Sequence, residues 1–193
     1  MLVSLLLSIL NVHGHVTANP NFGPAKGYLA TYFRIGHACT AAESTMKVEI
    51  EIPEGIYTAR PRYSAGWTYT VENQTLDTPI TGGESPITTK VTKVTFISAT
   101  GLANDAYDDL GLNFQLPDKA GTTLYFKTKQ FCTSNTTSWV NIPENNDVAK
   151  WSATPKPAPY VTIQAAAGSA SAESTAAAHD PTILGIGVAG ISD

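Results

Sequence analysis

The sequence lacks the motifs that mark the common hydrolases and nucleotide-binding enzymes. It contains no Gly-x-Ser-x-Gly, no His-Glu-x-x-His and no glycine loop of the kind that holds phosphate. With only four histidines in the chain, a Ser-His-Asp triad has few residues to draw on. Lys and Arg number 12 against 16 Asp and Glu, and they are scattered along the chain. This charge pattern argues against nucleic acid or an anionic membrane as the main partner.

Cysteine is also scarce, because Cys39 and Cys132 are the only two in the chain. No Cys-x-x-Cys occurs, so the pair does not have the spacing of a dithiol redox motif. In a secreted protein, two cysteines predict one disulfide, which leaves no thiol nucleophile.

A secretion signal is predicted at residues 1–14. Residues 1–10 are apolar but too few to cross a membrane, and Val12 and Gly14 take the −3 and −1 positions that signal peptidase prefers. We therefore expect a secreted, extracellular protein (periplasmic if the source is bacterial) whose mature chain begins at His15. Sequons at Asn73 and Asn135 are expected glycan acceptors if the source is a eukaryote.

An N-terminal His15 would offer two nitrogen donors from one residue. Its free α-amine and its imidazole form a bidentate chelate that suits one Cu(II) ion. Because protons compete for both nitrogens, we expect copper affinity to fall toward about pH 5. The alternatives are that the cut falls elsewhere or that His15 merely begins a strand.

Period-two alternation predicts an all-β fold. At 46–52, apolar and charged residues alternate, which is typical of a half-buried strand. Similar runs occur at 28–35, 67–71, 91–97, 110–116, 122–130, 138–142 and 160–164, with turn residues between them. We expect an antiparallel β-sandwich of the immunoglobulin or fibronectin type III kind over residues 15–164. The Ala/Ser-rich segment 165–193 predicts a disordered tail, and its apolar run at 183–191 is too short to favour a lipid anchor.

A few polar and aromatic residues are candidates for a site. His37 precedes Cys39 by two residues, so the disulfide would hold it in place, as a tentative metal ligand or as a structural residue. Glu43, Asp108 and Asp109 are candidate acid–base groups or oxygen ligands, although exposed loop carboxylates are more commonly only solvated. Among the tryptophans, Trp67 is expected to fill the core. Trp139 is expected either to pack in the core or to form an aromatic wall beside a metal.

These features together resemble the YcnI-like copper-binding domain family of secreted or periplasmic β-sandwiches. The resemblance covers residues 15–163, and its parts are individually weak but ordered as in the family. They include His15-Val16-Thr17, Gly27-Tyr28, Gly36-His37-Ala38-Cys39, Gly66-Trp67, Tyr107-Asp108-Asp109-Leu110, Gln130-Phe131-Cys132 and Trp139.

The resemblance implies one Cu(II) ion held by the amine and imidazole of His15, a mono-histidine brace, with Trp139 near the metal. In the family an acidic side chain completes the coordination. Where some relatives have Glu after the Gly-Tyr pair, this chain has Leu29. Either another oxygen donor serves or His37 takes its place.

The preferred hypothesis is a copper chaperone or scavenger without catalytic residues, whose partners are copper and a membrane copper transporter or a cuproprotein. Nucleic acid is not an expected partner. A second hypothesis is a copper-dependent oxidative enzyme resembling lytic polysaccharide monooxygenases, with His37 as the second copper histidine. A third is a metal-free adhesion sandwich on the cell surface.

Overall fold

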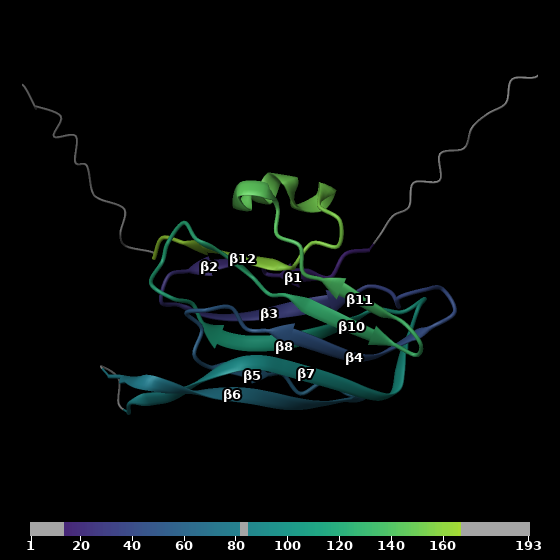
Figure 1. Ribbon diagram of the computed structural model, residues 1–193, viewed down its shortest axis with the longest axis horizontal. Helices are drawn as coiled ribbons and strands as arrows, with labels where there is room; N and C mark the ends of the chain where they lie inside the picture. The colour runs from purple at the N-terminus through teal and green to yellow at the C-terminus, as the bar shows by residue number, and fades with distance from the viewer. Residues whose placement is uncertain (1–13, 82–84, 167–193) are drawn as a thin grey trace, which may run out of the picture.

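Alternating side chains place each strand of the first large sheet. In β3 (Tyr28–Ile35), Leu29, Thr31, Phe33 and Ile35 are buried while Tyr28, Ala30 and Arg34 are exposed. This strand lies between β1 (Thr17–Asn19) and β8 (Asp108–Gln115), and β5 (Ala59–Pro61) forms the far edge of the sheet. All of these pairings are antiparallel. Figure 1 shows the computed structural model, which describes residues 14–81 and 85–166.

The second large sheet packs against the first, and its five strands are also antiparallel. Its order is β11 (Thr136–Trp139), β10 (Thr128–Cys132), β4 (Ser44–Glu51), β7 (Ile87–Ala103) and β6 (Trp67–Ile80). A small third sheet joins β2 (Phe22–Pro24), β12 (Tyr160–Gln164) and β9 (Thr123–Tyr125), with β2 and β12 parallel. Two short 3-10 helices, η1 (Glu144–Asn146) and η2 (Val148–Ala153), lie at the edge near β12 and β1 (Figure 1).

The core between the sheets is aromatic at its centre. Phe126 packs against Phe33 and Phe114, with ring centroids 5.1 and 5.3 Å apart, and all three are essentially inaccessible to water. Trp67 is also buried, as the sequence predicts, and its indole nitrogen donates to Asp108 at 2.7 Å. Each large aromatic side chain of this kind buries about 150 to 250 Å² of surface.

The predicted all-β sandwich with one disulfide is confirmed, while some boundaries were wrong. The strands expected at 28–35 and 160–164 coincide with β3 and β12. The strand expected at 122–130 is instead two, because β9 pairs with β12 and β10 pairs with β4. β6 and β7 are much longer than expected, since they form a ribbon with exposed polar residues on both faces. β1, β2 and β5 were not predicted at all.

The Cys39–Cys132 disulfide joins the loop after β3 to the end of β10, with a Cα–Cα distance of 5.9 Å. All of the predicted signal segment except Gly14, and all of the predicted tail except residues 165 and 166, lie outside the described residues. Within the part of the chain that the structure describes, no helix is both long enough and apolar enough to cross a membrane.

Candidate metal site

The pairing of β1 with β3 brings the two histidines of the described residues to one end of the sandwich. Because the strands are antiparallel and Thr17 lies opposite Arg34, the residues before β1 lie beside the loop that follows β3. His15 is in the first of these segments and His37 is in the second. Val16 is fully buried and holds the start of β1 against the core.

His15 and His37 line one hollow of about 330 Å³ together with Trp139. The Trp139 ring presents an edge to both imidazoles, with centroids 6.0 Å from His15 and 6.2 Å from His37. The remaining lining residues are Cys39, Thr137, Pro155 and Lys156. The structure thus brings together the three residues that the sequence proposed for a metal site.

The His37 ring is oriented by its own backbone neighbourhood. Its Nδ1 forms a short hydrogen bond with the carbonyl oxygen of Ala38. A carbonyl can only accept, so the proton is on Nδ1 and the lone pair of Nε2 is available to a ligand. Gly14 packs against that edge of the ring, since a Cβ built on Gly14 would lie 3.3 Å from Nε2 and 2.8 Å from Cδ2. If the chain were cut after Gly14, the new amine of His15 would therefore arise beside His37 Nε2.

A buried polar network fixes both the His37 loop and Trp139. The side chain of Gln130 is buried, and its amide donates to the His37 carbonyl at 2.6 Å and to Thr45 Oγ1 at 2.7 Å. Its carbonyl oxygen accepts from Trp139 Nε1 at 3.0 Å. Outer partners of this kind set the orientation of metal ligands in proteins. Sequence reasoning missed Gln130, because a glutamine in a strand carries no signal that its face is buried.

Trp151 also belongs to the site, although the sequence assigned it no role. Its ring meets the His15 imidazole edge-on, with centroids 5.2 Å apart and an interplanar angle of 90°. The indole nitrogen donates to the Ala158 carbonyl at 2.6 Å, which ties η2 to the segment before β12. The His15 ring therefore packs against two tryptophans and is half-buried.

The hollow does not contain the acidic ligand that the family resemblance implies. None of its described lining residues is Asp or Glu, and it includes a cation, Lys156. Leu29 is buried in β3 and faces the core, so its position in this chain offers no oxygen donor to the hollow. Of the two options left by the sequence, the arrangement favours His37 over a carboxylate.

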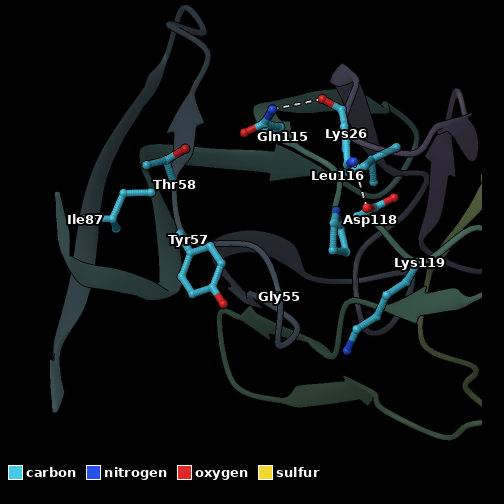
Figure 2. Close-up of a pocket in the computed structure, with 10 residues that line it drawn as sticks. Lys26, Gly55, Tyr57, Thr58, Ile87, Gln115, Leu116, Asp118 and Lys119 are labelled. Carbon is cyan, nitrogen blue, oxygen red and sulfur yellow. Dashed lines mark hydrogen bonds and ion pairs between the residues drawn. The ribbon is translucent and has the colours of Figure 1, made fainter. Parts of the chain in front are cut away.

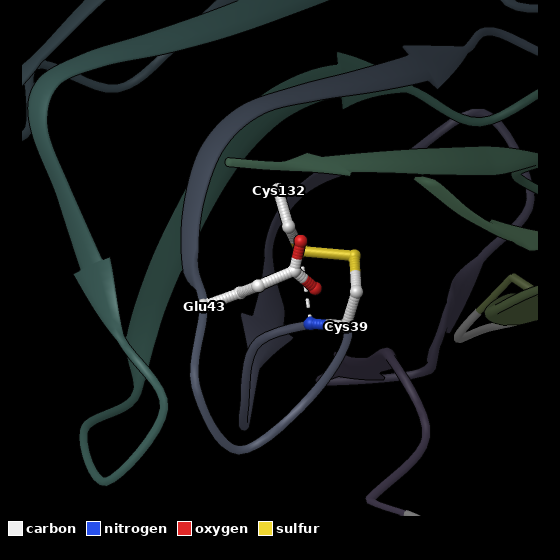
Figure 3. Close-up of side chains that lie close together, drawn as sticks. All are labelled: Cys39, Glu43 and Cys132. Carbon is white, nitrogen blue, oxygen red and sulfur yellow. Dashed lines mark hydrogen bonds between the residues drawn. A yellow bond between two sulfur atoms is a disulfide. The ribbon is translucent and has the colours of Figure 1, made fainter. Parts of the chain in front are cut away.

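Glu43, a candidate oxygen ligand from the sequence, stabilises a turn and does not line the hollow. It lies beside the disulfide (Figure 3), and the three side chains have the spacing of a metal site, but each sulfur is already bonded to the other. One Glu43 oxygen accepts from the backbone nitrogens of Ser134 and Asn135, each at 2.8 Å, and thereby anchors the β10–β11 turn. Burial alone would raise the pKa of Glu43, but hydrogen bonds from Asn135, Ser134 and Thr40 outweigh it and lower that pKa.

Asp108 and Asp109 are likewise engaged away from the hollow. Asp108 accepts from the Trp67 indole, and Asp109 forms a bidentate pair with Arg34 at 2.8 Å for both contacts. The hydrogen bond and charge of Arg34 hold the pKa of Asp109 below its ordinary value near 3.8, although partial burial acts in the opposite direction. Neither carboxylate is among the described residues that line the hollow of His15 and His37.

Removing the Asp109 charge is expected to change how stability depends on pH. The lowered pKa means that this carboxylate stabilises the fold above its unfolded value near 3.8 and that the contribution is lost as pH falls below it. An Asp109→Asn protein should therefore unfold at a lower temperature than wild type at pH 7. Thermal unfolding followed by circular dichroism should show this difference shrinking as the pH drops through 4 toward 2. A difference that stays constant with pH would contradict this role.

A separate hollow of about 360 Å³ lies near β8 and the residues just beyond it (Figure 2). It contains no histidine or cysteine among its described lining residues. Its one described carboxylate, Asp118, is paired with Lys26 at 2.8 Å, and its remaining charged side chain, Lys119, is a cation. It therefore offers no competing metal site.

The fold and this end of the molecule define an immunoglobulin-like β-sandwich with a histidine–tryptophan hollow. A family model described as a domain of unknown function, DUF1775, matches residues 15–163. The chain belongs to this family, the YcnI-like domains, as the sequence predicted.

The structural comparison agrees with the fold. The chain is similar to a crystal structure of an uncharacterized protein from Nocardia farcinica, reported to have an immunoglobulin-like fold, with a TM-score of 0.58 and 21% identity. That match covers 78% of this chain and 98% of the other. No curated protein matches the chain.

Proposed function

We propose that this is a secreted protein that carries one Cu(II) ion as cargo, as a chaperone or scavenger. The observation that carries the proposal is the position of Gly14 against the Nε2 edge of His37. After removal of residues 1–14, the amine and imidazole of His15 and the Nε2 of His37 would face one hollow. The family match begins at the same residue, His15.

The chemistry of these donors supports copper. Amine and imidazole nitrogens suit Cu(II), which also stands highest among divalent first-row metals in the affinity order. The hollow offers no carboxylate from its described lining, so the hard cations calcium and magnesium are poorly matched. Lys156 lines the same hollow, and its long side chain can keep the ammonium in water while its stem covers the rim.

Trp139 and Trp151 support the binding by excluding water. Trp139 is buried and its ring is steeply inclined to both imidazoles, and the half-buried Trp151 also contacts the His15 ring. A protein that only stores or transfers an ion benefits from such cover, since it keeps small oxidants and competing ligands from the metal.

Removing His37 is the direct test of the third nitrogen. We expect His37→Ala to weaken Cu(II) binding by more than about a hundredfold, since even groups that only support metal ligands contribute 10- to 100-fold. Isothermal titration of Cu(II) into a chain that begins at His15 measures the effect. His179→Ala, the same change outside the family match, should bind like wild type. Equal affinities for His37→Ala and wild type would remove His37 from the site, and a flat wild-type titration would favour a metal-free adhesion sandwich.

The approach of His37 to His15 also favours one alternative, an oxidative copper enzyme with two histidines on the metal. Ascorbate-dependent oxidation of chitin or cellulose by the copper-loaded protein would distinguish it from a carrier. Copper binding without oxidised products supports the carrier. Products that disappear in His37→Ala support the enzyme.

A further inference from the structure

All three arginines of the chain gather on one face that the copper proposal does not use. Arg34 lies in β3 between Phe33 and Ile35, which are fully buried, so its side chain points out of the sandwich. Arg60 follows the buried Ala59 in β5, and Arg62 lies just beyond that strand. β5 pairs with β8 and β8 with β3, so the three arginines share the outer face of one sheet.

Four of the eight tyrosines lie on the same face or at its rim. Tyr28 and Tyr32 alternate with buried residues along β3, and Tyr28 is 73% exposed. Tyr63 and Tyr107 lie in loops at one end of the face and are 82% and 63% exposed. Such exposure of large aromatic rings is uncommon on a surface that has no partner.

Two adjoining hollows run across this face and share Arg62. The first, of about 310 Å³, is lined by residues that include Tyr32, Arg60, Arg62, Gly111 and Asn113. The second, of about 550 Å³, contains Arg62, Tyr63 and Tyr107. Gly111 makes the first hollow possible, because a Cβ there would lie 2.8 Å from Arg62 Cβ and 3.2 Å from the Tyr32 ring.

The charge on this face is positive although the protein as a whole is at −4. Arg34 is neutralised by its bidentate pair with Asp109 and stacks on Tyr107 at 4.5 Å. Arg60 and Arg62 form no ion pair with any described carboxylate within 4.0 Å, and Arg62 lies over the Tyr32 ring at 5.4 Å. Both arginines are exposed and line the first hollow, and the charge of Arg62 also helps to lower the pKa of Asp109.

We propose that this face binds an acidic saccharide, a chain of sugars bearing carboxylates. Guanidinium groups bind carboxylates through two parallel hydrogen bonds, which lysine cannot form. The tyrosine rings offer flat apolar faces to the C–H face of a sugar ring, and the Asn113 amide can bond a hydroxyl. Arg60 and Arg62 would select the carboxylate, and Tyr32, Tyr63 and Tyr107 would hold the rings.

The density of charge favours a saccharide over single-stranded nucleic acid. Aromatic side chains also stack on bases, but binding of that kind needs a groove with many cations following the phosphates. Here only two arginines are unpaired, and Asp108 and Asp109 line the second hollow. A sugar chain with spaced carboxylates matches two cations among several tyrosines.

The test measures binding of a galacturonic acid tetrasaccharide to the metal-free protein by isothermal titration, with a chelator present so that copper plays no part. We expect the double variant Arg60→Gln, Arg62→Gln to bind about tenfold more weakly or worse, since each charged hydrogen-bonded contact contributes about that factor. Lys127→Gln, Lys129→Gln changes the net charge equally on the exposed side of the other sheet and should bind like wild type. The galactose tetrasaccharide should bind weakly to all of them.

Each contrary outcome overturns a defined part of the proposal. If wild type does not bind the acidic saccharide, or binds the neutral one equally, no carboxylate site exists. Equal loss in the lysine variant would show only a general charge effect. Tighter binding of a short oligothymidylate that is lost in the arginine variant would replace the saccharide with nucleic acid. Both arginines are exposed, and unchanged thermal unfolding of the variants would show that the fold is intact.

Discussion

A chain that carries Gly-Ser-Gly-Ser-Gly in front of His15 is expected to lose high-affinity copper binding, because five added residues keep the new terminal amine too far from the His15 imidazole to form a chelate with it. The extension converts the α-amine of His15 into a peptide nitrogen, and the chelate ring formed by amine and imidazole can no longer close on Cu(II). Even outer partners of metal ligands contribute 10- to 100-fold in affinity, so loss of a first ligand should cost more than about a hundredfold. Isothermal titration at pH 7 to 8 compares the extended chain with one that begins at His15.

The control for this experiment is a chain that begins at His15 and carries His15→Ala. It keeps the free amine but lacks the imidazole, and it should be as weak as the extended chain. If the extended chain binds copper as tightly as the His15-starting chain, the terminal amine is not a ligand and the brace model is wrong. Mass spectrometry of naturally secreted protein gives an independent check, because processing at a bond other than Gly14–His15 would leave no such amine.

Loss of the disulfide is expected to have the largest effect on stability. The bond closes a loop with a sequence separation of 93, and on the chain-entropy model such a loop contributes about 4 to 5 kcal/mol by restricting the unfolded chain. The double variant Cys39→Ser, Cys132→Ser should show this decrease in the free energy of unfolding. Urea unfolding followed by tryptophan fluorescence measures it.

The same variant should also weaken copper binding, because Cys39 fixes the loop that contains His37. Glu43→Gln provides a matched comparison, since it weakens the anchor of the β10–β11 turn and leaves the covalent bond in place. It should lose less stability than the disulfide variant. A disulfide variant as stable as wild type would show that the sheets alone hold the two ends together.

Much of the fold could be predicted because the strands facing the core alternate strictly. β3 and β12 have this pattern over their whole length, and their bounds were predicted correctly. The end of β6 could not be predicted from the sequence, because its pairing with β7 continues beyond the core. There both faces of the ribbon are polar, so apolar and polar residues do not alternate. The break near Phe126 was equally invisible, since the alternation of buried and exposed residues continues from Leu124 to Gln130 while the partner changes from β12 to β4.

The site was predictable only in part for a related reason. His15 was found from a processing pattern, His37 from its position beside the predicted disulfide, and Trp139 as a candidate aromatic wall that the family resemblance also places near the metal. Gln130 and Trp151 contribute through contacts between segments distant in space, to which spacing along the chain gives no guide. The arginine face was missed because Arg34 is separated in sequence from Arg60 and Arg62, and only the β3–β8–β5 pairing brings them together.

The hairpin from Gln130 to Trp139 has a length that cannot easily vary. The register sets Thr128 opposite Trp139 and Gln130 opposite Thr137. Within this hairpin, the Gln130 amide holds the His37 loop, the Cys132 sulfur is bonded to Cys39, and the Trp139 indole lies beside both imidazoles. One inserted residue would turn the following side chains to the opposite face. Natural variants should therefore tolerate insertions in the β6–β7 turn far more readily than in this hairpin.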